Sequence, residues 1–312
     1  MAKVAFVFPG QGSQFVGMGR DLAARFPEAK EVFAAADGAL GEKLSALCFQ
    51  GPEDALKLTA NTQPAILTAS IAAQAVLAKR VPAPVFAAGH SLGEYSALVA
   101  SGALSFTEAV RAVRVRGRLM QEAVPPGVGA MAAVLGLSSD AVKRICGEVA
   151  DGQVLEPANY NSPEQTVIAG HAAAVERAKS PLKDAGARRV VPLAVSAPFH
   201  CALMEPVKAP LRDGLAAIAF KPPTSPVVTN VEAKPNSDPA RVAALLIEQV
   251  TRPVRWVESV EEMCRGGVSR FVEVGPGKVL RGLIRQIAPQ AEVLNAEDAE
   301  SLENVLAALE GQ

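Results

Sequence analysis

Residues 89–93 read Gly-His-Ser-Leu-Gly, and the serine at their centre is the strongest candidate nucleophile of the chain. An apolar run over 85–88 precedes the motif, and a helix-favouring segment follows it. A serine between a strand and a helix occupies a turn so tight that the flanking positions must lack side chains. The order of these elements therefore predicts a nucleophile elbow with Ser91 at its tip.

A serine nucleophile needs a general base, and the chain contains three histidines. His90 lies inside the elbow, where we expect its ring to point away from the Ser91 hydroxyl, and His171 is expected near the start of a surface helix. His200, in a loop over 198–201, is by elimination the best candidate base. No acidic residue between Ser91 and His200 is an evident partner, so a triad and a dyad oriented by a main-chain carbonyl both stay open.

Arg116 is the second residue whose position indicates chemistry. On a helix over 107–123, projected at about 100° per residue, Arg111, Arg114 and Arg118 share a polar face, whereas Arg116 falls among apolar side chains. A guanidinium on an apolar face keeps its proton and needs an anionic partner. Periodicity alone leaves open whether this partner is a carboxylate of the protein or of a substrate.

The glycine-rich loops do not predict a nucleotide cofactor. Gly10-Gln11-Gly12 lacks the third glycine of a dinucleotide fingerprint, and 275–278 lacks the spacing of a phosphate-binding loop. Main-chain amides near Gln11 are instead placed to join the Leu92 amide in an oxyanion hole. No His, Cys or acidic cluster has metal-ligand spacing, so we expect neither a metal nor a bound cofactor.

Composition limits the partners and the compartment. The 312 residues include 31 basic and 32 acidic side chains, so no global field attracts nucleic acid or an anionic membrane. Four scattered cysteines fit a reducing compartment, and the apolar stretches are too interrupted to span a bilayer. We expect a cytoplasmic protein, and because nothing such as a heptad run calls for association, we expect a monomer.

The elements that position these residues predict two domains. Apolar runs at 4–8 and 270–274 are typical of buried parallel strands, and a capping box at 105–108 opens the helix that carries Arg116. From 128 to 195 the pattern changes to strand, helix, strand, strand, helix, strand, the order of a ferredoxin-like unit. We predict an α/β fold with a main domain over 1–126 and 197–312 and an insert over 127–196.

Together these motifs resemble the malonyl-CoA:acyl-carrier-protein transacylases of the acyltransferase family, over essentially the whole chain. The matching segments are Phe-Pro-Gly-Gln-Gly-Ser-Gln at 8–14, Asn-Thr-Gln-Pro-Ala at 61–65, Gly-His-Ser-Leu-Gly-Glu-Tyr at 89–95, Arg-Gly at 116–117, Gly-Ala-Met-Ala-Ala at 129–133, Asn-Tyr-Asn-Ser-Pro at 159–163, Pro-Phe-His at 198–200 and Val-Gly-Pro-Gly at 274–277. The resemblance implies an α/β-hydrolase-like parallel-sheet domain with a ferredoxin-like insert.

The resemblance also implies roles for individual residues. Ser91 would carry the malonyl group, His200 would act as base, and Arg116 would hold the malonyl carboxylate. The other implied site residues are Gln11 and Leu92, whose amides hold the oxyanion; Gln249, whose main-chain carbonyl orients the histidine; Gln63, Asn159 and Asn161, which line the pocket or fix its loops; and Phe199, which leaves little room for an α-methyl branch.

The implied activity is acyl-carrier-protein S-malonyltransferase. The malonyl group passes from malonyl-CoA to the serine and then to the phosphopantetheine thiol of acyl carrier protein, in ping-pong order, for fatty-acid synthesis. Three alternatives stay open: a serine thioesterase or esterase with the same dyad, a polyketide-pathway acyltransferase, and a non-catalytic scaffold that binds acyl carrier protein. The candidate residues for docking that acidic carrier are Arg111, Arg114, Arg118, Lys183, Arg188 and Arg189.

Overall fold

A six-stranded sheet forms the centre of the computed structural model, which describes residues 2–195 and 197–310. Its strand order is β10-β9-β1-β2-β7-β8, and all neighbours are parallel except β7 and β8. The strands are β1 Lys3–Phe8, β2 Phe86–Gly89, β7 Val227–Val228, β8 Pro235–Asn236, β9 Val268–Val274 and β10 Glu292–Ala296.

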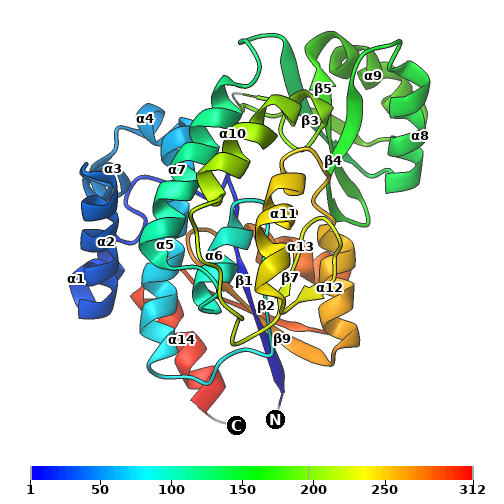
Figure 1. Ribbon diagram of the computed structural model, residues 1–312. Coiled ribbons are helices and arrows are strands. Elements are labelled where there is room, and N and C mark those ends of the chain that lie inside the picture. The colour runs from blue at the N-terminus through cyan, green and yellow to red at the C-terminus, as the bar shows by residue number, and fades with distance from the viewer. Residues whose placement is uncertain (1, 196, 311–312) are drawn as a thin grey trace.

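Helices cover both faces of this sheet (Figure 1). Alternate residues of β1 point to opposite faces, so Phe6 and Phe8 pack in one core while Ala5 and Val7 pack in the other. A strand covered on both sides is apolar throughout, which explains the run at 4–8. The helices outside the second sheet are α1 Arg20–Arg25, α2 Pro27–Leu40, α3 Leu44–Gln50, α4 Glu53–Lys57, α5 Thr59–Ala78, α6 Gly93–Ala100, α7 Phe106–Glu122, α10 Glu205–Leu215, α11 Pro239–Gln249, α12 Trp256–Arg265, α13 Val279–Ile287 and α14 Ala299–Glu310, with a 3₁₀ turn at Ala202–Met204.

A smaller antiparallel sheet lies beyond the carboxyl ends of the central strands, at the upper right of Figure 1. It has the order β4-β5-β3-β6 and carries two helices with their own apolar core. The elements run β3 Gly129–Leu135, α8 Ser139–Val149, β4 Leu155–Ser162, β5 Gln165–His171, α9 Ala172–Asp184 and β6 Arg189–Pro192, the order that the sequence pattern predicts. Val254, in the segment between α11 and α12, ties the main part of the chain to the edge strand β4, since the Tyr160 amide donates to its carbonyl over 2.9 Å.

Several sequence predictions of individual elements are confirmed and one is wrong. Ser105 caps α7, because its hydroxyl accepts from the Glu108 amide at 3.4 Å. The sequence Val-Val-Thr-Asn at 227–230 predicts a strand over all four residues, but only Val227 and Val228 form it. Asn230 leaves the sheet because its amide donates to the Glu94 carboxylate instead. The expected end of the insert at 196 lies outside the described residues.

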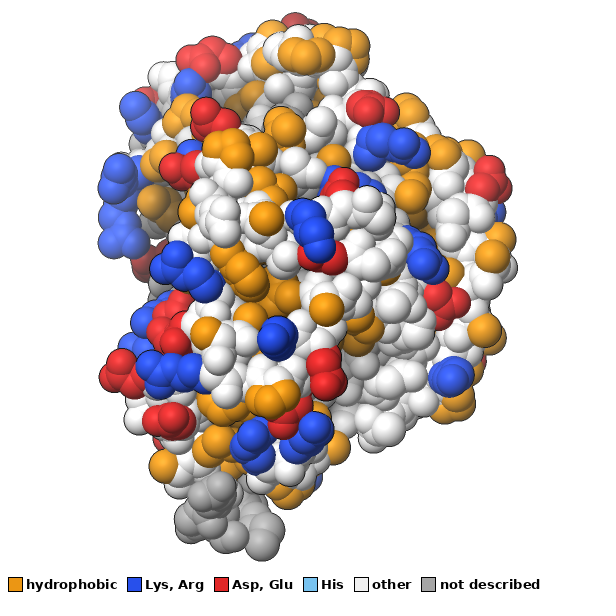
Figure 2. All heavy atoms as spheres, turned by 90° about the vertical axis from the view of Figure 1, so that its left-hand side faces the viewer, with side chains coloured by type: hydrophobic (Ala, Val, Ile, Leu, Met, Phe, Trp, Pro, Cys, Tyr) orange, Lys and Arg blue, Asp and Glu red, His pale blue; other side chains and the backbone are white. Residues whose placement is uncertain are grey.

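The surface carries mixed charge. Figure 2 shows Lys and Arg side chains among Asp and Glu side chains on the face that includes α1, α2 and α3, with hydrophobic side chains between them. This agrees with the formal net charge of −1. Within 2–195 and 197–310, none of the helices is long and apolar enough to cross a membrane.

The helix α7 lies unusually close to α5 because residue 117 is glycine. A Cβ on Gly117 would stand 2.6 Å from the Thr59 carbonyl oxygen and 2.9 Å from Ala60 Cα, which are backbone atoms that cannot move independently. The close approach brings the preceding residue, Arg116, against Gln63 of α5.

We predict that Gly117→Ala lowers the free energy of unfolding by about 1–3 kcal/mol, because the added methyl group overpacks the contact between α5 and α7. Urea unfolding of the purified variant measures the change. Gly147→Ala in α8 is the matched control, since a Cβ there meets no atom within 4 Å. It is expected to be neutral or stabilising. Equal stability of the Gly117 variant and the wild type would contradict the argument.

Candidate active site

Ser91 stands at the tip of a tight turn between β2 and α6. Its backbone has a φ of 51°, in the left-handed region that costs a non-glycine residue energy. A Cβ on Gly89 would lie 1.9 Å from Gly93 carbonyl atoms, and a Cβ on Gly93 would lie 2.1 Å from the Phe8 carbonyl oxygen. The two glycines are therefore required by the packing of the elbow, which exposes the serine hydroxyl at the carboxyl end of β2.

His200 lies within hydrogen-bond distance of this hydroxyl. The distance from Ser91 Oγ to His200 Nε2 is 2.7 Å, and His200 Nδ1 lies 2.8 Å from the main-chain oxygen of Gln249. A carbonyl oxygen only accepts, so Nδ1 carries the proton and Nε2 presents its lone pair to the serine. In the described chain no carboxylate contacts His200, and the geometry is that of a dyad oriented by a carbonyl.

The surroundings of His200 keep its ring uncharged. The residue is 3% exposed. Burial and, after it, the positive charge of Arg116 together lower the pKa of His200 to about 3, against the opposing effect of the Gln249 carbonyl. A neutral imidazole is the form that can accept the serine proton.

Arg116 is buried beside the same hydroxyl, without a carboxylate partner. Its Nη1 donates to Gln63 Oε1 at 2.7 Å, and its Nη2 donates to Gln249 Oε1 at 2.9 Å and to Ser91 Oγ at 3.2 Å. The guanidinium carbon lies 5.6 Å from the centre of the Tyr95 ring, and Nε has no hydrogen-bond partner. Among the described residues no acidic side chain forms an ion pair with it. The two amide oxygens and the ring provide no counter-charge in direct contact, and Glu94 acts on the guanidinium only from a distance.

Glu94 and Asn230 also belong to the site, although sequence reasoning did not select them. Asn230 Oδ1 accepts from the Ser91 amide at 2.7 Å, and Asn230 Nδ2 donates to the Gly89 carbonyl at 2.6 Å, so this side chain fastens both sides of the elbow. Glu94 Oε2 accepts from the Asn230 amide at 3.0 Å. A buried acid directly after the elbow was a signal for Glu94; Asn230 had none, because only the pairing of β7 with β2 brings it there.

A cavity of about 200 Å³ opens beside the elbow, between the central sheet, the small sheet and α13. Gln11 and His90 line it from the central sheet, and Asn159 and Asn161 line it from β4. Asn161 Oδ1 lies 2.8 Å from His90 Nε2, which turns the His90 ring toward the cavity wall and not toward the serine. The structure thus brings both asparagines to the site.

The remaining predicted residues lie around this cavity or next to the dyad. The main-chain amides of Gln11 and Leu92 have no acceptor in the described structure, and the Gln11 side chain donates to Thr59 Oγ1 at 3.2 Å. Phe199 precedes His200 and is buried in the main core at 7% exposure. His171 is remote from the site, because its Nδ1 accepts from the Val154 amide.

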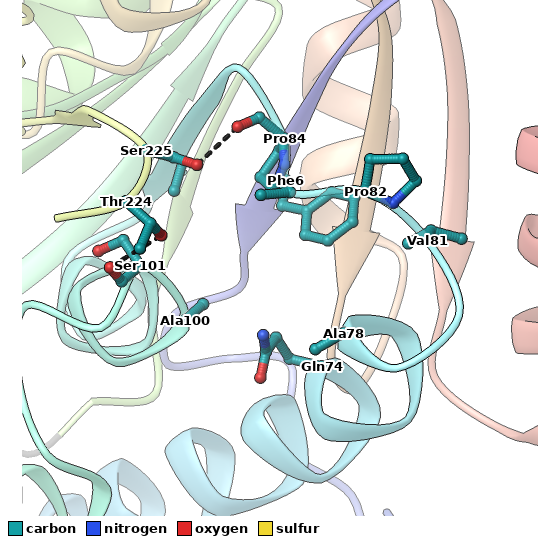
Figure 3. A pocket seen from close by; sticks show the side chains of 12 residues that line it. Phe6, Gln74, Ala78, Val81, Pro82, Pro84, Ala100, Ser101, Thr224 and Ser225 are labelled. Carbon is teal, nitrogen blue, oxygen red and sulfur yellow. Dashed lines mark hydrogen bonds between the residues drawn. The ribbon is translucent and has the colours of Figure 1, made fainter.

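A second cavity, of about 210 Å³, lies at the opposite ends of the central strands (Figure 3). It is lined by the loop before β2, by Phe6, and by polar side chains such as Gln74 and Thr224. Ser91 follows the carboxyl end of β2, so this cavity is remote from the serine and cannot bind a group that reacts with it. Over residues 2–195 and 197–310 no cluster of three His, Cys, Asp or Glu side chains is arranged to hold a metal ion.

Comparison with known proteins agrees with this architecture. The family model of the acyl transferase domain matches residues 5–305. A malonyl CoA-acyl carrier protein transacylase of Escherichia coli (strain K12) is 52% identical over 302 residues, which cover 96% of this chain and 98% of that protein.

Two solved structures are also similar to this chain over essentially its whole length. An acyl carrier protein S-malonyltransferase from Vibrio cholerae aligns with a TM-score of 0.95 at 48% identity, covering 97% of this chain and 100% of that one. A malonyl-transacylase in complex with its type II polyketide acyl carrier protein aligns with a TM-score of 0.96 at 48% identity, covering 100% of both chains. This chain therefore belongs to the acyl transferase family and, within it, to the malonyl CoA-acyl carrier protein transacylases.

Proposed function

We propose that this protein transfers the malonyl group of malonyl-CoA to the phosphopantetheine thiol of acyl carrier protein, supplying fatty-acid synthesis. One observation carries the proposal: Ser91 Oγ lies within 3.2 Å of both a neutral histidine and a buried arginine that has no carboxylate partner. The first contact provides a nucleophile and the second provides a site for an anion. The names of the relatives add the identity of the acyl group and of the carrier.

Acylation begins when His200 Nε2 takes the Ser91 proton and Oγ attacks the thioester carbonyl. The carbonyl oxygen becomes an oxyanion, which the free amides of Gln11 and Leu92 stabilise. The tetrahedral intermediate collapses by breaking the carbon–sulfur bond, and His200 returns its proton to the leaving thiolate. In the second half the phosphopantetheine thiol gives its proton to His200 and attacks the carbonyl carbon of the malonyl-serine. The bond from that carbon to Ser91 Oγ then breaks, and His200 returns the proton to Oγ, which restores the free serine.

Arg116 selects the acyl group. In malonate one methylene separates the reacting carbonyl from the free carboxylate, so an acyl group on Ser91 Oγ places its carboxylate near a guanidinium nitrogen 3.2 Å from that oxygen. A charge-assisted contact of this kind is strong in a site closed to water. A neutral acyl group leaves the arginine without a counter-ion.

The hydrolase and the scaffold, two of the alternative functions, each leave part of this site without a role. A hydrolase of neutral esters has no use for a buried guanidinium beside its serine, and a non-catalytic scaffold has no use for the contact between Ser91 and His200. A polyketide-pathway transacylase would perform the same chemistry on another carrier. The malonyl-transacylase structure with a polyketide carrier has the same fold, so the chemistry is common to both pathways.

Docking of an acidic carrier would need basic side chains that are exposed and uncommitted. Arg118, Lys183 and Arg189 are exposed and have no ion pair within the described chain. Arg114 bonds Glu42 and Asn61, and Arg188 bonds Glu164, so their charges are partly offset. Arg111 is exposed as well, but its Nε donates to the Ala39 carbonyl at 3.0 Å, so Arg118, Lys183 and Arg189 are the stronger docking candidates.

We further propose that residues 127–196 form a ferredoxin-like insert in an α/β-hydrolase-like domain over 1–126 and 197–312. The strand order β4-β5-β3-β6 and the separate core of the small sheet support this division. All four cysteines are free, which fits a reducing cytoplasm where CoA and acyl carrier protein also occur. We propose that the enzyme acts there as a monomer.

Intact-protein mass spectrometry after brief exposure to malonyl-CoA tests the function. We expect a malonyl adduct on the wild type that disappears when holo acyl carrier protein is added, and no adduct on Ser91→Ala. Acetyl-CoA serves as the comparison substrate. Continuous CoA release without an adduct would mean that water resolves the acyl-enzyme, and the hydrolase alternative would replace the transferase.

We predict that Arg116→Ala lowers kcat/KM for malonyl-CoA by about a hundredfold, the loss expected when a buried charge-assisted contact is removed. Selection against acetyl-CoA should relax, because the variant has no unpaired guanidinium that disfavours a neutral acyl group. Initial rates of acyl transfer, measured with malonyl-CoA and with acetyl-CoA, give kcat/KM for each substrate. A malonyl-to-acetyl ratio equal to that of the wild type would rule out the carboxylate contact.

We predict that acetyl-serine formation keeps its rate between pH 7.5 and pH 5.5. With a pKa of about 3, His200 stays neutral throughout this range. A histidine with an ordinary pKa would be about nine-tenths protonated at pH 5.5, and the rate would fall about tenfold. Acetyl-CoA is used because it does not engage Arg116, and quenched-flow mass spectrometry gives the rate. Burial raises the pKa of Glu94 to about 7, inside this range, so Glu94→Gln is measured alongside. A tenfold fall in both proteins would show that the histidine titrates normally.

A further inference from the structure

Glu94 is a buried carboxylate that the proposed reaction does not use. It is 2% exposed and follows the elbow as the second residue of α6. We propose that Glu94 is a positioning residue: it fixes the side-chain amide of Gln249 and, through it, the Arg116 guanidinium for a carboxylate-bearing acyl group. The inference rests on the proposed role of Arg116 and adds a residue to it.

The contacts of Gln249 define the orientation of its amide. Its Nε2 donates to Glu94 Oε2 at 2.7 Å and to the Ser91 carbonyl at 3.1 Å, which uses both of its hydrogens. Its Oε1 is thereby turned to Arg116 Nη2, at 2.9 Å. Gln249 is completely buried, so water cannot replace any of these partners.

The reversed amide is excluded by the match of donors to acceptors. It would place Oε1 against the Glu94 carboxylate and the Ser91 carbonyl oxygen, and it would turn two N–H groups toward the Arg116 cation. Acceptors would face acceptors and donors would face donors, so every hydrogen bond of the amide would be lost. Without Glu94 the Gln249 Nε2 would keep a single acceptor, the Ser91 carbonyl, through the longer of its two bonds.

Gln249 contacts His200 and Arg116 through different atoms. Its main-chain oxygen accepts from His200 Nδ1, and this oxygen is fixed by the backbone at the end of α11. Its side chain reaches Arg116. Loss of Glu94 should therefore disturb the arginine more than the base, which separates a positioning role from a general structural one.

Glu94 acts as an acceptor and does not need its charge. A single oxygen, Oε2, accepts from both Asn230 and Gln249. The amide oxygen of a glutamine has two lone pairs and can accept both bonds in the same place. Glu94→Gln should therefore keep both hydrogen bonds. Glu94→Ala removes the acceptor, and Glu94→Asp shortens the side chain by one methylene, which moves the acceptor away from Gln249.

The test compares kcat/KM for malonyl-CoA and acetyl-CoA in the full-length enzyme. We expect Glu94→Ala and Glu94→Asp to lower the malonyl-to-acetyl ratio by about tenfold, chiefly through a higher KM for malonyl-CoA, and Glu94→Gln to change it by less than about threefold. If the alanine variant does not fold, the aspartate variant tests the same contact, with acetyl transfer as the internal measure of folding.

Glu273→Ala is the matched control. Glu273 is equally buried and accepts two main-chain amides, of Leu280 and Arg281, at 3.0 and 2.7 Å, but contacts neither Gln249 nor Arg116. We expect its removal to leave the ratio as in the wild type.

Equal losses for both substrates in the Glu94 variants would overturn the inference, and so would a glutamine variant as defective as alanine. Arg116→Ala separates this outcome from failure of the proposed function. If that variant loses malonyl preference while Glu94→Ala keeps it, only the positioning role is wrong.

Discussion

A guanidinium held out of water without a carboxylate is the constraint on which the arrangement of this protein depends. Desolvating Arg116 is costly unless its donors are satisfied, and here two glutamine oxygens, one on α5 and one on α11, accept from it. Gly117 lets α7 approach α5 closely enough for the first contact. Three helices from distant parts of the chain must therefore pack to fixed distances before the site exists.

The second constraint is steric and lies in the elbow. Strand β2 and helix α6 meet so closely that a methyl group on either flanking glycine would overlap backbone atoms. The left-handed backbone of Ser91 is kept in place by Asn230, which bonds the amide on one side of the turn and the Gly89 carbonyl on the other. The nucleophile is thus positioned by backbone packing and one side chain, before any substrate contributes binding energy.

Much of this site is predictable from the sequence because its main residues break local rules. Two features can be recognised from the sequence alone: a serine between glycines after an apolar strand, and an arginine on an apolar helix face. Asn230 cannot be recognised in this way, since an asparagine after a short strand is ordinary and only sheet pairing gives it a role. The strand β10 is not predicted either, because the pattern of its five residues, Glu292–Ala296, is short and tertiary packing decides it. The strand expected to reach residue 230 was wrong because a buried carboxylate competes for its amide.

The proposed clamp and the proposed base are also coupled by charge. The positive charge of Arg116 contributes to the low pKa of His200, and so it weakens the base of the empty site. A carboxylate placed on Arg116 offsets that charge, and Coulomb's law then requires the imidazole to become more basic. A neutral acyl group brings no such compensation. On this proposal the arginine favours malonyl twice, through the contact itself and through a histidine that is a stronger base when the matching substrate is present.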